Sequence, residues 1–540
     1  MNNLSRFLGE RRADAVSGFL VFLIALPLCF GIAVASGFPP MAGIFSGIIG
    51  GLVVSRINGS RLTITGPAAG LITVLFASVQ ALGQGDLLAG YRYTLAAIVV
   101  AGLLQVILGI RKAGRLATFF PAAVAHGMLA AIGIIIIAKQ AHILLGAKPD
   151  AVTPWQSLAH IPQSLIYFNP GIFMVGLLGL GILFAWPLLR GRGIGRVPAP
   201  IMVALTGAVL GRMLDLDHAE LFRSVSAEGG ALGRAIYTTA PQFLADVPDW
   251  ILDSVVWPDF SKVGTLDFWN ATLSLFLIAS IESLLAASAV DRLDPEKRRS
   301  NLDRDITAIG VGNLLSGSIG GMPMIVEIVR SSANVGYGAR SGWSNFFHGL
   351  FLLLFIVLFP HIIRSIPLAS LAALLIYVAS RMASPRAFTR TLEIGPEQLA
   401  LFVITVIGIL ASNILVGVAI AIAVKLLLHR WRGVPLSNLF QLAYQISRDA
   451  DGAYRIHING AAVFSNFFSL ESEFAEFPAG GKVVFDLANA SLIDHTVMDF
   501  IDRFRREYVA QGGECVVSGL AGSAPDTAHP LAARRRKALG

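Results

Sequence analysis

Fourteen apolar segments, separated by polar or charged stretches, make up most of the first 430 residues of the chain. They cover residues 15–36, 41–56, 66–82, 91–110, 122–145, 170–189, 198–213, 267–288, 303–317, 323–337, 343–363, 367–379, 397–411 and 413–430. Several are shorter than the roughly 20 residues of a simple spanning helix, which is typical of broken or packed helices inside a membrane protein. The pattern predicts a polytopic α-helical membrane domain over residues 14–430, preceded by a short segment, residues 1–13.

Two of these segments begin with a glycine–proline break. Residues 62–70 read LTITGPAAG, and residues 318–323 read SIGGMP before a helical stretch that carries Glu327 and Arg330. A helix that starts inside the membrane leaves its first backbone N–H groups free, and these groups and the helix dipole form an anion site. The pair therefore predicts a transporter site between two interrupted helices. The alternative is that each break marks a turn between ordinary spans.

The position of the breaks suggests an internal repeat. They fall in the third and tenth segments, and their prolines lie 256 residues apart (323 − 67 = 256). Seven spans per half is an odd number, so the second half would enter the membrane from the opposite side, as in a 7+7 inverted repeat with the two half-helices meeting at the midplane. The same offset carries the first span, around Leu26, onto Glu282 in the eighth. The first, third, eighth and tenth spans are thus expected to line one site.

Lysine and arginine collect in alternate loops, which sets the orientation. The basic loops lie near residues 56–61, 111–115, 190–196, 292–304 and 381–390. The longest loop of the other set, residues 214–266, is acidic instead. Because cytoplasmic loops carry the excess of lysine and arginine, this alternation predicts that the N-terminus and the part of the chain after residue 430 are cytoplasmic.

The composition agrees with a membrane protein and excludes other classes. Of the 540 residues, 55% are hydrophobic and only 14% are charged, and the mean hydropathy is +0.69. The net charge of +8 is explained by the cytoplasmic loops, so no nucleic acid partner is expected. Neither Cys29 nor Cys515 has metal-ligand neighbours in the sequence. No catalytic constellation is apparent either, so we expect no enzyme activity, no metal site and no cofactor.

A different pattern follows the last apolar segment. Residues 431–439 read as a linker, and residues 440–522 alternate strand-like and helical stretches, as in a small α/β domain. The expected strands lie near residues 454–458, 482–487 and 514–518, with an amphipathic helix near residues 496–508. Residues 523–540 are rich in alanine, proline and arginine and are expected to form a disordered tail.

Several longer motifs carry a family resemblance. They read ALPLCFGIAVASGFPPMAGIFS at 25–46, TGPAAG at 65–70, SIESLLAASAVDR at 280–292, GNLLSGSIGGMP at 312–323 and VRSSANVGYGARS at 329–341. With them, roughly residues 12–520 resemble the bacterial sulfate permease (SulP) family of anion transporters with a C-terminal STAS domain. The resemblance implies a multi-pass protein of the bacterial inner membrane, a core-plus-gate arrangement, elevator-type alternating access and a homodimer.

The resemblance also implies a substrate site between the starts of the third and tenth helices. The residues carried over are Thr65, Gly66, Pro67 and Ala68; Met324, Ile325, Val326, Glu327 and Ile328, with Arg330 a turn deeper; and Leu28 and Ile32 of the first span. Glu282 stands where sodium-coupled bicarbonate transporters of the family have a sodium-binding aspartate. The neighbouring hydroxyl of that sodium site is replaced by Ala286, which argues against sodium. Glu282 and Glu327 are the candidates for coupling to H⁺ or Na⁺.

Glu327 departs from the pattern of many relatives, which have a small residue or serine there. A fixed negative charge should repel an anion, and three interpretations are open. Glu327 could pair with Arg330 at i+3 on the same helix; it could be protonated when substrate binds; or it could point away from the site, although an unpaired buried charge is costly. Asn334 and Asn345 are expected to satisfy broken-helix backbone, and His126, Lys139 and His142 to serve interfacial contacts or packing.

The C-terminal domain offers one weak regulatory candidate. Residues 486–500, DLANASLIDHTVMDF, resemble the STAS strand–loop–helix signature, in which relatives that regulate sigma factors have a phosphorylatable serine or threonine after the aspartate. Here the order is Asp494, His495, Thr496, and the signature's glycine is missing. Thr496 is therefore a candidate regulatory site or, equally well, a helix N-cap.

Together these features predict a secondary active transporter of small inorganic oxyanions, sulfate or bicarbonate, coupled to H⁺ or Na⁺ and embedded in the lipid bilayer. Alternatives are a dicarboxylate or nucleobase transporter on the same fold, an uncoupled anion exchanger or channel, and a membrane-tethered signalling protein. Nucleobase relatives also have a glutamate in the eighth span, but they generally lack a C-terminal STAS domain. Both sulfate and bicarbonate would suit two helix starts, so the choice between them stays open.

Overall fold

The computed structural model divides the chain into two units: residues 1–114 with 132–382, and residues 115–131 with 383–540. The basic loop at 190–196, three stretches of the acidic loop at 214–266 and residues 537–540 lie outside the described part of the chain. The described residues are 2–112, 121–147, 154–189, 197–214, 220–223, 236–239, 251–291, 293–296, 298–359, 366–412, 414–449, 451–467, 470, 473, 477–478, 480–510 and 512–536.

Each of the fourteen predicted apolar segments contains a helix. In order these are α1 (Asn2–Ala35), α2 (Pro40–Ile49) continued by η1 (Gly50–Val54) and α3 (Ser55–Ile57), α4 (Ile72–Gly83), α5 (Leu87–Ile110), α6 (Ala122–Leu144), α9 (Pro170–Ala185), α10 (Ala199–Met213), α11 (Leu266–Asp291), α12 (Leu302–Ser318), α13 (Ile328–Gly336), α14 (Trp343–Leu358), α16 (Leu368–Met382), α18 (Pro396–Ala411) and α19 (Ile414–Trp431). Among the described residues, 8 helical segments are long and apolar enough to cross a membrane. The predicted polytopic α-helical fold is confirmed, whereas the count of fourteen spans and the inverted repeat stay predictions.

Short elements connect these helices. They are α7 (Pro154–Ala159), α8 (Ile161–Ile166), η4 (Trp186–Leu189), β2 (Glu220–Arg223), β3 (Ile236–Thr239), η7 (Ile251–Ser254), α17 (Pro385–Ile394) and α20 (Leu436–Phe440). His142 at the end of α6 contacts two of these connections. Its Nδ1 lies 2.8 Å from Ser164 Oγ and its Nε2 lies 2.9 Å from the Ser157 carbonyl, which confirms the packing role expected for this histidine.

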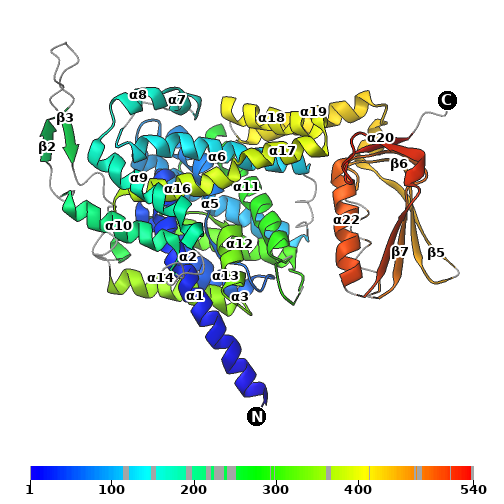
Figure 1. Cartoon of the computed structure of the whole chain (residues 1–540), viewed down its shortest axis with the longest axis horizontal. Helices are drawn as coiled ribbons and strands as arrows, with labels where there is room; N and C mark the ends of the chain where they lie inside the picture. The colour runs from blue at the N-terminus through cyan, green and yellow to red at the C-terminus, as the bar shows by residue number, and fades with distance from the viewer. Residues whose placement is uncertain are drawn as a thin grey trace. The chain divides into compact units, whose positions relative to one another are not determined.

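A buried polar network fixes the helices of the first unit around the two breaks. In this unit α1 lies beside α14, and α5 lies beside α11 and α12 (Figure 1). Gln105 on α5 donates to Ser280 Oγ on α11, and Asn313 on α12 donates to Gln105 Oε1. The amide oxygen of Asn313, Oδ1, accepts the backbone N–H of Met324 at 2.6 Å. Since buried polar groups are costly unless hydrogen-bonded, this chain of bonds specifies where the second break lies.

The two interrupted helices meet in a short antiparallel strand pair. β1 (Thr65–Pro67) pairs with β4 (Met324–Val326), with Gly66 opposite Ile325. A 3-10 turn, η2 (Ala69–Leu71), then leads into α4, and α13 follows β4 at Ile328. The strands start 259 residues apart (324 − 65 = 259), as do the helical parts (328 − 69 = 259). The structural offset exceeds the proline spacing of 256 because Pro67 lies inside its strand, whereas the second proline precedes its strand.

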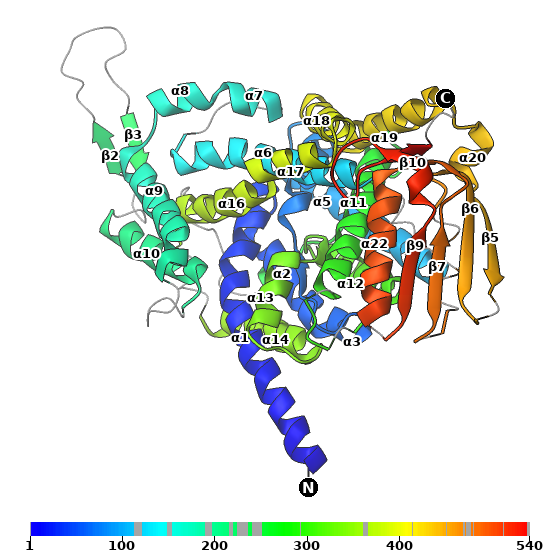
Figure 2. The same ribbon diagram turned by 45° about the vertical axis from the view of Figure 1, so that its right-hand side comes forward.

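A mixed β-sheet covered by one helix forms the C-terminal part of the second unit. Its strands are β5 (Ala443–Arg448), β6 (Tyr454–Ala462), β7 (Lys482–Asp486), β8 (Ala490–Ile493), β9 (Glu514–Ser518), β10 (Ser523–Pro525) and β11 (Arg534–Arg536). The order is β10-β11-β8-β6-β7-β9, with β5 also paired to β6. Helix α22 (His495–Ala510) lies against one face of the sheet (Figure 2), where Val497, Ile501 and Phe504 join the buried core. The predicted α/β pattern is therefore confirmed.

The predicted disordered tail is wrong for the residues that the structure describes. Within residues 523–536, β10 pairs with β11, and β11 pairs with β8 through Arg534 and Arg535. In the loop between the two strands, Thr527 donates its hydroxyl to the Ile394 carbonyl at 2.9 Å. The composition of this segment did not show that its backbone completes the sheet edge, because strand pairing of that kind depends on a distant partner.

Asp494 joins α22 to the sheet, and its removal should destabilise the C-terminal part. Its carboxylate accepts the N–H of Val497 at 2.9 Å and that of Phe464 at 2.8 Å. Asp494, rather than Thr496, thus caps the helix, and Thr496 is only its second residue. We expect Asp494→Ala to cost about 1–2 kcal/mol and to accelerate amide hydrogen exchange across residues 495–510. Asp502→Ala, on the more exposed side of α22, is the control and should leave exchange nearly unchanged.

The same carboxylate makes this stability depend on pH. Burial raises the pKa of Asp494, but the side chains of His429 and Lys425 and the Val497 N–H outweigh it and hold the pKa below its usual range. A carboxyl group with a depressed folded pKa adds stability above its unfolded pKa of about 4, and this stability is lost as the pH falls through the folded value. Protection of α22 should therefore fall below about pH 4 in the wild type, and this contribution should be absent in the Asp494→Ala variant.

Candidate anion-binding site

Side chains from neighbouring helices satisfy the free edges of the β1–β4 strand pair. Asn345 on α14 donates its amide to the Gly50 carbonyl at 3.3 Å and accepts the N–H of Thr65 at 3.4 Å, and Ser331 Oγ accepts the N–H of Ile64 at 2.9 Å. On β4, the N–H of Val326 donates to Ser283 Oγ at 3.3 Å. Asn334 likewise donates to the Leu62 carbonyl at 2.9 Å. The backbone-satisfying roles predicted for Asn334 and Asn345 are confirmed, and the strand pair is a rigid frame for the site.

Arg330 is held beneath β1. Its side chain is 1% exposed, and its Nη2 donates to the Pro67 carbonyl at 3.1 Å. Its Nη1 lies 3.6 Å from Cys29 Sγ on α1, and its Nε has no hydrogen-bond partner. A Cβ at Gly66 would lie 2.7 Å from Nη1, so the glycine leaves the space that the guanidinium occupies. The structure thus brings a cation, one nitrogen of it unpartnered, to the point where α1, β1 and α13 meet.

Glu282 lies at the start of the first interrupted helix, η2 and α4. It is 8% exposed on α11, and it packs so closely against Gly70 that a Cβ there would overlap its Oε1. That oxygen has no hydrogen-bond partner. The start of a helix favours negative charge because its N–H groups and dipole point toward it. The carboxylate of Glu282 therefore lies at the end of η2 and α4 that an anionic substrate would also prefer.

Glu327 occupies the N-cap position of α13 but does not cap it with its side chain. It is half-buried, and the next two residues, Ile328 and Val329, are 44% and 48% exposed. No ion pair joins Glu327 to Arg330, both of which the structure describes, because the arginine runs back beneath β1 instead. The first interpretation of Glu327, an ion pair with Arg330, is therefore wrong. The N–H of Val326, the residue before Glu327, donates to Ser283 Oγ, the residue after Glu282, at 3.3 Å, so the two carboxylates belong to one site.

The other predicted site residues lie around this frame. Leu28 and Ile32 on α1 are buried, at 7% and 2% exposed, and α1 contacts both β1 and α4. Thr65 is fully buried, and its hydroxyl accepts a hydrogen bond from Asn345. Residues of the first, third, eighth and tenth predicted segments thus come together as expected. Cys29 and Ser283 were missed from the sequence, although each directly follows a predicted residue, Leu28 and Glu282.

The surroundings of Ala286, which stands in place of a hydroxyl of the sodium site of related transporters, are apolar. Ala286 is 7% exposed and packs in a buried cluster with Ile309, Met324 and Val326. Over the described residues, no group of three or more His, Cys, Asp or Glu side chains could hold a metal ion. The methyl group of Ala286 offers no oxygen ligand, which is the type of ligand that hard cations prefer.

A family model described as the sulfate permease family matches residues 12–407 of the chain. The chain belongs to the sulfate permease family. The matched residues contain both breaks, Arg330, Glu282 and Glu327, so every charged group of the site described above lies inside the family region. Because the family consists of multi-pass anion transporters, the helices and the site belong to a membrane transporter rather than to a soluble protein.

Relatives within the sulfate permease family differ in the substrate that their names state. The putative sulfate transporter YvdB of Bacillus subtilis is 26% identical over 482 residues, covering 88% of this chain and 84% of the relative. The bicarbonate transporter BicA of Picosynechococcus sp. is 26% identical over 496 residues, covering 91% and 82%. The structure of SLC26A9 superposes with a TM-score of 0.66 at 12% identity, covering 94% of this chain and 84% of that one, which shows the fold alone.

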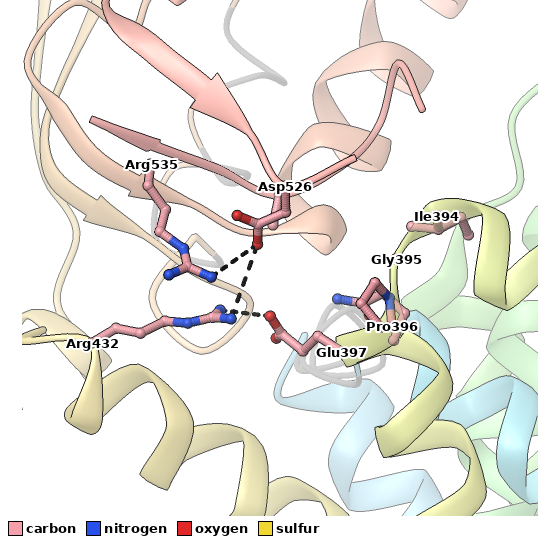
Figure 3. A pocket seen from close by; sticks show the side chains of 9 residues that line it. Ile394, Gly395, Pro396, Glu397, Arg432, Asp526 and Arg535 are labelled. Atoms are coloured by element: carbon pink, nitrogen blue, oxygen red, sulfur yellow. Dashed lines mark hydrogen bonds and ion pairs between the residues drawn. The ribbon is translucent and has the colours of Figure 1, made fainter. Parts of the chain in front are cut away.

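A pocket of about 210 Å³ lies in the second unit beside the start of α18 (Figure 3). Glu397 there receives Lys425 Nζ at 2.5 Å and Arg432 Nη1 at 2.6 Å. Arg432 also lies 4.0 Å from Asp526, which Arg535 reaches at 3.3 Å. Each of these cations already has a carboxylate beside it, so the pocket is a less suitable anion site than the one at the strand pair.

Proposed function

We propose that this family member is a secondary active transporter of a small inorganic oxyanion, sulfate or bicarbonate. The observation that carries the proposal is the placement of the buried Arg330 guanidinium under a strand pair from which two helices start in the interior of the protein. Helix starts and arginine are the two features by which proteins bind oxyanions without a metal. The names of the relatives, a putative sulfate transporter and a bicarbonate transporter, support the same substrate class.

The position of Glu282 favours protons as the coupling ion. An ionised Glu282 would occupy the start of η2 and α4 itself and would repel an incoming oxyanion. A protonated Glu282 would leave that helix start free for the substrate. Binding of the anion and binding of a proton to Glu282 would therefore favour each other, which is the thermodynamic requirement for symport. Sodium remains the alternative coupling ion, with less support because Ala286 supplies no ligand.

We further propose the setting that the family implies. The protein would lie in the bacterial inner membrane with its N-terminus and C-terminal sheet domain in the cytoplasm, and it would work as a homodimer by elevator-type alternating access. The alternation of basic and acidic loops supports this orientation. The C-terminal sheet domain would act as a STAS-like regulatory module. Thr496, at the second position of α22, would be its modification site.

A competition experiment tests the substrate class. Purified protein would be tested for binding of labelled sulfate and labelled bicarbonate, with unlabelled sulfate, bicarbonate, fumarate or uracil as competitor. We expect displacement by the inorganic oxyanions at concentrations at which fumarate and uracil have no effect. Displacement by fumarate or uracil instead, or thermal stabilisation by one of them alone, would replace the oxyanion proposal with a dicarboxylate or nucleobase transporter on the same fold.

A further inference from the structure

Lys139 is a cation on a membrane helix, and it packs on an aromatic ring, in agreement with the interfacial or packing role expected from sequence. It lies on α6, a 23-residue apolar helix, and its side chain is half-buried. Its Nζ lies 3.3 Å from the centroid of the Phe76 ring on α4. No carboxylate of the described residues lies within ion-pair distance of it. A cation–π contact is worth about 0.5–2 kcal/mol. The ring carries no charge, so it does not neutralise the ammonium.

The face of α4 that carries Phe76 leads away from the proposed anion site. Thr73, Phe76 and Gln80 follow one another at helical spacing, so they lie on one side of the helix. Phe76 lies six residues beyond Gly70, the residue against which Glu282 packs, or about 9 Å along a helix. The stripe therefore starts at the helix end that would bind the substrate and continues past Lys139.

Thr73 provides an independent sign of a missing ligand on this face. It is 9% exposed, and its Oγ1 is buried without a hydrogen-bond partner. Ser78, on another side of the same helix, donates its hydroxyl to the Val74 carbonyl at 2.8 Å, as buried hydroxyls in helices commonly do. The Thr73 hydroxyl is thus without a partner one turn beyond Gly70, which meets Glu282, and one turn before Phe76, which meets Lys139.

The order of the segments sets the direction of this stripe. α4 runs from the strand pair to Gln84, and Lys139 lies five residues before the end of α6 at Leu144. In the orientation proposed from the loop charges, both helices end on the side opposite the cytoplasm. The face with Thr73, Phe76 and Gln80 would therefore lie between the outer surface and the two helix starts.

We propose that Lys139, positioned by Phe76, is the fixed cation of an outer entry site for the oxyanion. The Thr73 hydroxyl would contact the anion on its way from this site to the helix starts. The inference rests on the proposed function and adds a second, outer site to it. The ammonium attracts the anion before Arg330 does, and its contact with an uncharged ring, rather than with a carboxylate, leaves its charge available. Lys139 is in this account a binding residue, and Phe76 is a positioning residue.

Uptake kinetics of Lys139 variants test the entry site. Initial rates of labelled sulfate and labelled bicarbonate uptake would be measured in intact cells over a range of external concentrations. Loss of one charge-assisted contact is worth about 1.5–3 kcal/mol, so Lys139→Gln should raise the external KM at least about tenfold and change the maximal rate little. Lys139→Arg should keep the KM near the wild-type value, and Thr73→Val should raise it by a smaller factor.

Two controls separate this outcome from a structural effect. Arg381→Gln removes another cation that lies over an aromatic ring, that of Tyr377 at 5.0 Å, and should leave the KM unchanged. Lys139→Gln should not lower the thermal stability, since it removes an uncompensated charge from an apolar helix. An unchanged KM in Lys139→Gln, or equal defects in the Gln and Arg variants, would overturn the entry site. If the wild type takes up neither anion, the proposed function itself fails. This result differs from the two outcomes that would overturn the entry site alone, because there the wild type still takes up the anion.

Discussion

Replacing Arg330 with alanine should lower anion uptake at least about 100-fold while leaving a folded protein. The guanidinium is buried, donates to the Pro67 carbonyl and keeps one nitrogen without a partner. Two charge-assisted hydrogen bonds to an oxyanion, at about 1.5–3 kcal/mol each, account for a loss of this size. The variant would also leave the Pro67 carbonyl without its donor, which costs about 1–3 kcal/mol of stability. Uptake into proteoliposomes, with size-exclusion profiles and melting temperatures alongside, measures both effects.

Two further variants show whether charge, geometry or folding is responsible. Arg330→Lys keeps the charge but loses the planar fork, so we expect uptake between those of wild type and Arg330→Ala. Arg304→Ala is a matched control, because Arg304 also donates to a backbone carbonyl, that of Ile57, but is solvent-exposed; its uptake should be normal. Wild-type uptake by a folded Arg330→Ala protein would show that the anion does not bind at the strand pair.

Glu282→Gln should abolish accumulation driven by a proton gradient and leave exchange intact. Glutamine has nearly the shape of the protonated acid but neither takes up nor releases a proton. The substrate would still bind at the start of α4, so labelled anion should exchange for unlabelled anion at a rate comparable to wild type. Glu327→Gln should weaken the gradient effect less, because Glu327 is half-buried whereas Glu282 is only 8% exposed. Both quantities are measured with one set of proteoliposomes, with and without an imposed pH difference.

Asp305→Asn is the matched control for Glu282→Gln. Asp305 is also buried, but its carboxylate accepts the N–H groups of Gly59 at 2.8 Å and Ser60 at 2.9 Å. Its substitution should reduce stability and leave the gradient dependence of transport unchanged. Full proton-driven accumulation by the Glu282→Gln protein would assign coupling to another group.

The interrupted helices were predictable because their signal is local. The Gly-Pro breaks and the apolar stretches around them stand out in the sequence, and both strands of the resulting pair fall where the breaks were read. The fourteen apolar segments each contain a helix for the same reason. Likewise, α22 shows its core face as apolar residues at helical spacing, and it was predicted within two residues at each end.

The features that could not be predicted depend on contacts between distant residues. A pair between Arg330 and Glu327 was one of three interpretations, suggested because they are neighbours on a helix, yet the partners of Arg330, Pro67 and Cys29, lie more than 250 residues away in the sequence. Gly66 and Gly70 were read as parts of a break, whereas the structure shows that they make room for Arg330 and Glu282. The pairing of β11 with β8 is another contact of this kind.

The most direct test of the account is concentrative uptake by the purified wild-type protein. Proteoliposomes would receive labelled sulfate or labelled bicarbonate under an inward proton gradient, an inward sodium gradient or no gradient. The account predicts accumulation of one of the two anions above its external concentration under the proton gradient, and its loss when the gradient is dissipated. Equilibration without accumulation under every gradient would contradict coupled transport and indicate an exchanger or channel. Absence of flux for both anions would contradict the oxyanion site itself.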